Sequence, residues 1–312
     1  MNETERWLIA SASVKGNSHE RGNQPNQDAF FIAHNDEETV VAVAVCDGAG
    51  SARYSKQGAD HFAKHIANAL RSIGTRIDRD ELPVNHPHLL GDSIYSAIES
   101  ARNELDPKGE TLEEHHCTLV AFVASQKCRL VVKVGDSILT WSEAVTLSDG
   151  RVDYFANMLA TPQDRGEYVN ETSFVTQAQW RKHVDWFLLP QERPDGFVVL
   201  MTDGAAEIAT KAVGSNRNLH VYRPFFANLT FNLLVAKPEE RDKLVENSLS
   251  DPRTFVLTGD DKTMVFLIGR AALENAGKEP MVSAPPAIEG EGEMPITAMI
   301  ALRTDAFSPP QF

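Results

Sequence analysis

The chain is poor in cysteine and has no long apolar run. Its 312 residues include three cysteines, Cys46, Cys117 and Cys128, whose spacing matches no zinc or disulfide framework. Each lies in or beside an apolar stretch, so we expect reduced thiols in the core. No export signal opens the sequence, and no apolar segment approaches the ~20 residues that span a bilayer. We therefore expect a soluble, cytoplasmic protein with no membrane partner.

Positive charge is also scarce. There are 30 lysines and arginines against 44 aspartates and glutamates, which gives a formal charge of −14. Because nucleic-acid backbones require a basic surface, this balance argues against a nucleic-acid partner. The apolar fraction of 42% is large enough to build a full core in one large domain or two modest ones.

Short segments rich in Val, Ile and Phe alternate with helical patterns and predict an α+β fold. Apolar residues recur at helical spacing over 59–73 and again over 90–105. The three middle strand candidates have short connections, which favours an antiparallel meander. The predicted strands are Ala29–Ala33, Val40–Cys46, Thr118–Ala124, Arg129–Val134, Ile138–Trp141, Val184–Leu189, Phe197–Thr202 and Thr263–Gly269.

Two segments lack such patterns. Residues 150–180 show no clear period and contain Pro162 and Gly166, which indicates an irregular excursion near a site or a flap. After residue 272 the composition changes to Glu, Pro, Gly and Ala. We therefore predict a catalytic domain over residues 1–272 and an acidic, poorly ordered tail over 273–312.

Aspartates stand at the ends of five apolar strand candidates: Asp28, Asp47, Asp136, Asp203 and Asp261. An aspartate beside a glycine is by itself a common turn signal. Strand ends in one sandwich can converge, however, and converging carboxylates repel one another unless cations lie between them. Ligand sets made only of oxygen favour Mg²⁺ or Mn²⁺ over zinc.

Five segments resemble, in order, the motifs of the metal-dependent protein phosphatase 2C family, in a divergent bacterial form. They are Asn26-Gln-Asp-Ala-Phe, Val45-Cys-Asp-Gly-Ala-Gly-Ser, Val134-Gly-Asp-Ser, Met201-Thr-Asp-Gly and Asp260-Asp-Lys-Thr. The resemblance covers roughly residues 10–270. It implies a central β-sandwich of two antiparallel sheets flanked by helices, with two metal ions at one end.

The resemblance also implies roles for the residues. Asp47 would bridge two Mg²⁺ or Mn²⁺ ions, the Gly48 carbonyl would bind one of them, and Asp203 and Asp261 would bind the other. Asp136 would help to hold a third ion. Asp28, Asp47, Asp203 and Asp261 form the expected catalytic set. Paired cations can lower the pKa of a bridging water and supply hydroxide for in-line attack on phosphoserine or phosphothreonine.

Three positions depart from the family pattern. Asn23 stands where many members carry a phosphate-binding arginine, Gln27 replaces a metal-associated glutamate, and Ala49 replaces a histidine proposed as a general acid. The sequence leaves open which basic residue substitutes for the arginine: Lys15, His19, Arg21 or Arg53.

These departures motivate a rival hypothesis, a pseudophosphatase that keeps the fold without turnover. A hydrolase of small phosphoesters is a third possibility. The leading prediction is a phosphoprotein phosphatase that acts on a Ser/Thr kinase or its targets.

Histidines form two other groups. His61 and His65 are four residues apart on a predicted helix and could share a metal, although solvated helix histidines are the commoner case. The run His115-His116-Cys117 has no matching cluster elsewhere, and we interpret it as a strand entrance.

Overall fold

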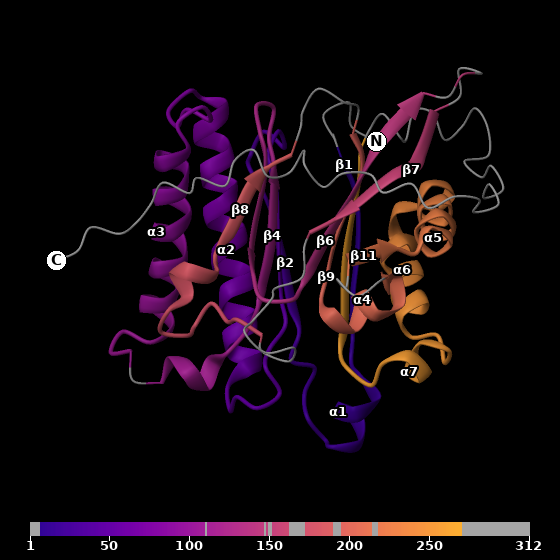
Figure 1. The fold of residues 1–312 in the computed structure, drawn as a ribbon, viewed down its shortest axis with the longest axis horizontal. Helices are drawn as coiled ribbons and strands as arrows, with labels where there is room; N and C mark the ends of the chain where they lie inside the picture. Colours follow the sequence, from indigo (N-terminus) through magenta and orange to yellow (C-terminus); the bar gives the residue numbers. More distant parts are fainter. Residues whose placement is uncertain are drawn as a thin grey trace. The chain divides into compact units, whose positions relative to one another are not determined.

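Two five-stranded antiparallel sheets form the centre of the fold, as the sequence predicts (Figure 1). The computed structural model describes residues 7–109, 111–146, 148, 152–161, 172–189, 195–213 and 218–269. The first sheet has the strand order β1 (Trp7–Val14), β12 (Lys262–Gly269), β9 (Asp195–Met201), β6 (Ile138–Thr146), β7 (Val152–Ala160). The second has the order β2 (Ala29–His34), β3 (Val41–Cys46), β4 (Leu119–Ala124), β5 (Arg129–Val134), β8 (Asp185–Leu188).

Strand β3 shows why both faces of the central sheets are buried. Successive side chains of a strand point to opposite faces. Val43 and Val45 accordingly lie in the apolar layer between the two sheets, whereas Ala42 and Ala44 belong to the layer beneath the helices. Small residues on the helix side let the helix approach the sheet closely, and β3 is buried along its whole length.

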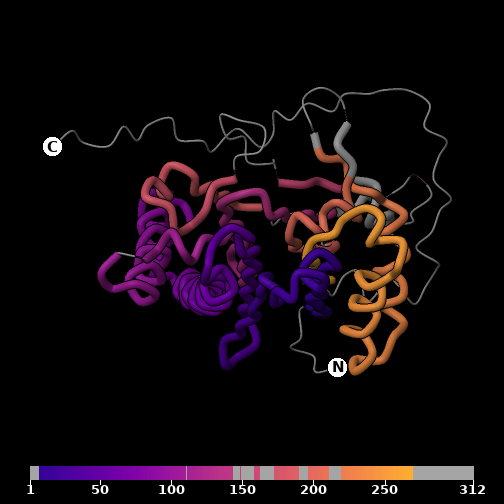
Figure 2. The backbone as a smooth tube through the Cα atoms, turned by 90° about the horizontal axis from the view of Figure 1, so that it is seen from below, coloured from indigo at the N-terminus to yellow at the C-terminus, as the bar shows by residue number. Residues whose placement is uncertain are grey.

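Helices cover the outer face of each sheet. Helix α2 (Ser55–Asp78) buries Phe62, Ile66 and Leu70 against the second sheet, beside α3 (Pro87–Leu105). On the first sheet lie α4 (Asp203–Ala209), α5 (Arg223–Val235) and α6 (Arg241–Leu249). Figures 1 and 2 show the resulting order of layers, helix, sheet, sheet, helix. The remaining elements are α1 (Asn17–Arg21), α7 (Thr254–Leu257), β10 (Thr210–Val213), β11 (Asn218–Val221), η1 (Leu112–His115), η2 (Trp180–His183) and η3 (Pro238–Glu240).

The structure corrects three details of the sequence prediction. Strand β1 was not anticipated, and β7 occupies part of the segment expected to be irregular. The proposed meander is also wrong at its third strand, because β6 leaves the sheet of β4 and β5 and pairs with β7 and β9. The connection passes through Gly135, whose φ of +93° suits a residue without a Cβ atom.

Other expectations have mixed outcomes. All three cysteines are free and buried, as predicted. None of the described helices is long and apolar enough to cross a membrane. The chain divides into two units, residues 1–281 and 282–312, and every described residue lies in the first. The predicted tail over 273–312 lies outside the described residues.

Candidate metal centre

The strand register brings the ends that carry aspartates to one edge of the sandwich. In the second sheet, Ala29 pairs with Cys46, so Asp28 and Asp47, which flank these two residues, lie at the same edge. In the first sheet, Met201 at the end of β9 pairs with Met264 near the start of β12 and with Ile138 at the start of β6. Asp203 follows Met201, whereas Asp261 precedes Met264 and Asp136 precedes Ile138. Antiparallel pairing therefore brings all five aspartates to this edge.

Asp47 and Asp203 form the centre of this cluster. Their carboxyl groups lie within reach of each other and affect each other's pKa, and a hydrogen bond between them can form only when one carries a proton. Burial raises the pKa of Asp47 well above its usual value, and the charges of Asp28 and Asp203 raise it further. Burial, followed by the charges of Asp136 and Asp260, raises the pKa of Asp203 to about 6. Below about pH 6, Asp203 therefore carries a proton that a cation could replace.

Asp28 is 2% exposed, and its charge acts on Asp47. Its Oδ2 accepts a hydrogen bond of 2.8 Å from the Thr202 hydroxyl, one residue before Asp203. Burial raises the pKa of Asp28 well above normal, and the charges of Asp261 and Asp203 add to the rise. The Lys56 ammonium donates to the Asp28 backbone carbonyl at 3.0 Å, which ties the start of α2 to this position.

Asp136 joins the cluster from the connection between β5 and β6. The Thr172 hydroxyl donates to its Oδ2 at 2.6 Å. Its Oδ1 is buried and has no hydrogen-bond partner among the described residues. Because an unpaired buried carboxylate oxygen is costly, this atom is suited to receive a cation.

Asp261 is engaged differently from what the resemblance implies. Its Oδ1 accepts from the Gly16 N–H at 2.7 Å, and its Oδ2 accepts from the Gln27 N–H at 2.6 Å. The His19 imidazole also lies 2.8 Å from Oδ2. Of about four lone-pair sites on a carboxylate, three are thus occupied. Asp261 therefore joins the N-terminal segment to β12 and has little capacity left as a ligand.

The neighbouring Asp260 is a ligand candidate that the sequence prediction missed. Its side chain is exposed. The charge of Asp260 raises the pKa of Asp203, whereas the charge of Asp261 raises the pKa of Asp28. One donor atom each from His19, Asp260 and Asp261 lies within 4.8 Å of the others. The only sequence signal was the doublet itself, which does not tell which of the two carboxylates is free to bind an ion.

The loop after Asp47 is held by the segment before β4. The Thr118 N–H donates to the Asp47 carbonyl at 2.8 Å, and the Ala49 N–H donates to the His116 carbonyl at 2.9 Å. A Cβ atom on Gly48 would lie 2.7 Å from the Gln27 carbonyl oxygen, so only glycine fits this close approach. These contacts fix the loop against the segment that precedes β4.

The positions that depart from the family pattern also lie at this edge. The Gln27 side-chain oxygen is buried without a partner among the described residues, so it can accept a cation or water. Of the four basic candidates, His19 contacts a carboxylate of the cluster through Nδ1, which lies 2.8 Å from Asp261 Oδ2. Arg53 lies with its guanidinium 5.0 Å from the centre of the Tyr54 ring.

The second histidine group has a structural role, consistent with a strand entrance. His116 bonds to the Thr176 hydroxyl at 2.8 Å and stacks on Phe174 with 4.7 Å between ring centroids. Cys117 is fully buried, and its backbone pairs with that of Gly48 in an isolated antiparallel β-bridge. Neither side chain belongs to a group of three metal-ligating residues in the described part of the chain.

The donor set of the cluster fits hard divalent cations. It consists of carboxylate oxygens, with buried oxygens of Asp136 and Gln27 that have no partner among the described residues. Mg²⁺ and Mn²⁺ prefer such oxygen ligands. A cation there would also relieve the repulsion that raises the pKa values of Asp28, Asp47 and Asp203.

The chain is similar to a curated bacterial phosphatase. A curated relative, serine/threonine-protein phosphatase 3 of Escherichia coli, is 26% identical over 268 residues, which cover 84% of this chain and 98% of the relative.

Two solved structures share the fold at low sequence identity. A sex-determining protein of C. elegans has a TM-score of 0.58 at 12% identity and covers 88% of this chain and 67% of its own. The serine-threonine phosphatase 2C of Toxoplasma gondii has a TM-score of 0.54 at 14% identity, with coverages of 85% and 95%.

The family model described as protein phosphatase 2C matches residues 15–250. That segment is more than half of the chain and contains Asp28, Asp47, Asp136 and Asp203, although it ends before Asp260. The chain therefore belongs to the protein phosphatase 2C family.

Proposed function

We propose that this protein is a Mg²⁺- or Mn²⁺-dependent phosphatase that hydrolyses phosphoserine or phosphothreonine in proteins. The observation that carries the proposal is the cluster of buried and partly buried carboxylates around Asp47 and Asp203, in which desolvation and the charges of neighbouring carboxylates raise the pKa values of both residues. The family membership and the name of the E. coli relative support a phosphoprotein substrate. The partner is then a Ser/Thr kinase or one of its targets.

In this proposal, Asp47, Asp203, Asp136 and the Gly48 carbonyl hold two or three ions. Asp260 joins them, and Asp261 contributes through its remaining lone pair. Bound ions would activate water for attack and neutralise the phosphoryl oxygens. The chain's own residues orient this set, since Asp261 joins Gly16 and Gln27 to β12 and Thr202 holds Asp28.

A basic side chain is still required to orient the substrate phosphate. We assign this task to His19, because its Nδ1 is held by Asp261 and its ring is partly exposed, with 17% of the side-chain surface accessible. In its protonated form this ring donates from Nδ1 to Asp261 and can donate a second hydrogen bond from Nε2 to a phosphoryl oxygen. Its neighbour Lys15 and the guanidinium of Arg53 could add long-range attraction for the dianionic phosphate.

The first prediction is metal dependence. Cys46 cannot substitute as a nucleophile, because burial raises the pKa of its thiol well above the usual value. Hydrolysis of p-nitrophenyl phosphate and of a phosphothreonine peptide should stop in EDTA and return with Mn²⁺ or Mg²⁺. Full turnover in excess EDTA would contradict the proposal. Activity on p-nitrophenyl phosphate alone would favour small phosphoesters, and tight Mn²⁺ binding with no turnover would favour a pseudophosphatase.

The second prediction separates the two aspartates of the doublet. Asp261→Asn should lower the free energy of unfolding by about 1–3 kcal/mol, because asparagine replaces one acceptor oxygen by a donor that faces backbone N–H groups. Asp260→Asn should weaken Mn²⁺ binding and turnover while changing the free energy of unfolding by less than about 0.5 kcal/mol. Urea unfolding and Mn²⁺ titration measure both effects.

Glu246→Gln on the exposed face of α6 is the matched control for removing one negative charge, and it should leave both quantities unchanged. The opposite pattern, a stable Asp261→Asn variant that has lost Mn²⁺ together with an unaffected Asp260→Asn variant, would return the ligand role to Asp261.

The third prediction concerns pH. Asp203 has a pKa of about 6 in the folded chain against an ordinary value of 3.8. Between these values the folded metal-free protein binds more protons than the unfolded chain, so its stability falls as pH rises. The loss should be about 1–3 kcal/mol between about pH 4 and pH 7. Mn²⁺ should reduce it, because cations replace the protons.

Urea unfolding of dialysed, metal-free protein at about pH 5 and pH 7.5 tests this sign. The difference between wild type and Asp203→Asn isolates the aspartate from groups of opposite sign, such as His116, whose pKa burial lowers. Asp251, with a pKa of about 2, acts below this window. The assignment would be overturned if wild type gained stability relative to Asp203→Asn as pH rose.

A further inference from the structure

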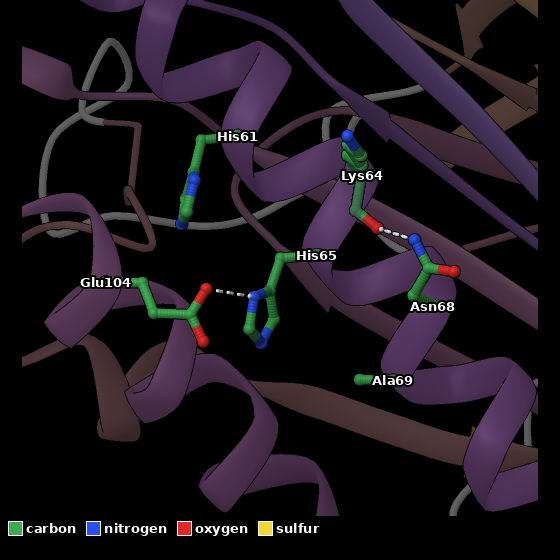
Figure 3. Close-up of a pocket in the computed structure, with 6 residues that line it drawn as sticks. All are labelled: His61, Lys64, His65, Asn68, Ala69 and Glu104. Carbon is green, nitrogen blue, oxygen red and sulfur yellow. Dashed lines mark hydrogen bonds and ion pairs between the residues drawn. The ribbon is translucent and has the colours of Figure 1, made fainter.

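A second group of potential metal ligands lies on the helical layer outside the second sheet. A cavity of about 500 Å³ is lined by six residues from α2 and α3: His61, Lys64, His65, Asn68, Ala69 and Glu104 (Figure 3). One donor atom each from His61, His65 and Glu104 lies within 4.8 Å of the others. From these residues we propose that the protein binds one zinc-class divalent ion between α2 and α3.

The helical repeat explains why the two imidazoles meet. Residues four apart on a helix lie on the same face, and the His61 and His65 rings are 5.8 Å apart between centroids. Glu104, on the neighbouring helix, turns its carboxylate toward His65, with 3.1 Å between Oε2 and Nδ1 (Figure 3). The three groups therefore bridge two helices that cover the same sheet.

A hydrogen bond to one ring nitrogen of His61 fixes its tautomer. Its Nε2 lies 2.8 Å from the Ala101 backbone carbonyl, and because a carbonyl only accepts, Nε2 carries the proton. In the neutral ring Nδ1 then keeps its lone pair. A backbone carbonyl on the second ring nitrogen is the usual support for a metal-binding histidine, since it fixes the tautomer and the ring orientation.

The hydrogen-bonded atoms of His65 and Glu104 already have the spacing of two ligands of one metal ion. Tetrahedral zinc with bonds of 2.0–2.2 Å needs ligand atoms about 3.3 Å apart, close to the distance between Nδ1 and Oε2. His61 must approach further, and Glu104 can follow because 57% of its side chain is exposed. Lys64, the cation of the cavity, points away from Glu104 (Figure 3).

The ligand chemistry distinguishes this site from the carboxylate cluster. Two imidazoles and one carboxylate favour Zn²⁺, with Co²⁺ and Ni²⁺ as close substitutes, and they leave a fourth position for water. Mg²⁺ prefers a set made only of oxygens. An excess of Mg²⁺ should therefore occupy the aspartates and leave the histidine site free for zinc.

The test uses the full chain in millimolar Mg²⁺, titrated with Zn²⁺ against a chromophoric chelator. Wild type should bind one Zn²⁺ ion that His61→Gln, His65→Gln and Glu104→Gln each lose or bind at least about tenfold more weakly. Zinc should raise the melting temperature of wild type but not of these variants. Circular dichroism of each variant in Mg²⁺ establishes that it is folded.

His88→Gln is the matched control. The His86 and His88 rings are also 5.8 Å apart, but they belong to no group of three ligating residues in the described chain. This variant should bind zinc like wild type. Equal zinc stoichiometry and affinity in wild type, His61→Gln and His65→Gln would overturn the proposal, as would a wild type that binds no zinc in Mg²⁺.

Discussion

Repulsion among carboxylates held at one edge of the sandwich is the constraint on which the site depends. Antiparallel pairing brings the strand ends together, and burial then makes each negative charge costly. The raised pKa values of Asp28, Asp47 and Asp203 record that cost. Protons or cations can compensate this cost, which is the physical basis of the proposed metal dependence.

Backbone contacts from distant segments keep the carboxylates together despite this repulsion. Asp261 accepts N–H groups from Gly16 and Gln27, which lie more than 230 positions away in sequence. Thr202 joins β9 to Asp28, and its hydroxyl also accepts from the Thr263 N–H at 3.0 Å. Hydrogen bonds to charged carboxylates are stronger than neutral ones. Asp261 thus has an architectural role, and we propose that its neighbour Asp260 binds ions.

The sequence predicted the fold class, and it marked candidate site residues because several apolar runs stop at an aspartate. It could not assign the doublet, since adjacent carboxylates look alike until the N–H groups of Gly16 and Gln27 are placed beside one of them. It also misplaced β6. A connection of three residues suits a hairpin or a crossing between sheets equally well, and the choice depends on tertiary packing around Gly135. The pairing of His65 with Glu104 required the position of α3, which periodicity does not give.

Proton release on Mn²⁺ binding tests the central claim most directly. Calorimetric titration at about pH 5.5, in buffers of different ionisation enthalpy, gives the number of protons displaced per protein. If Asp47 and Asp203 hold protons that cations replace, wild type should release about one proton or more, and Asp203→Asn should release fewer. Mn²⁺ binding without proton release, equal in wild type and in Asp203→Asn, would contradict the account.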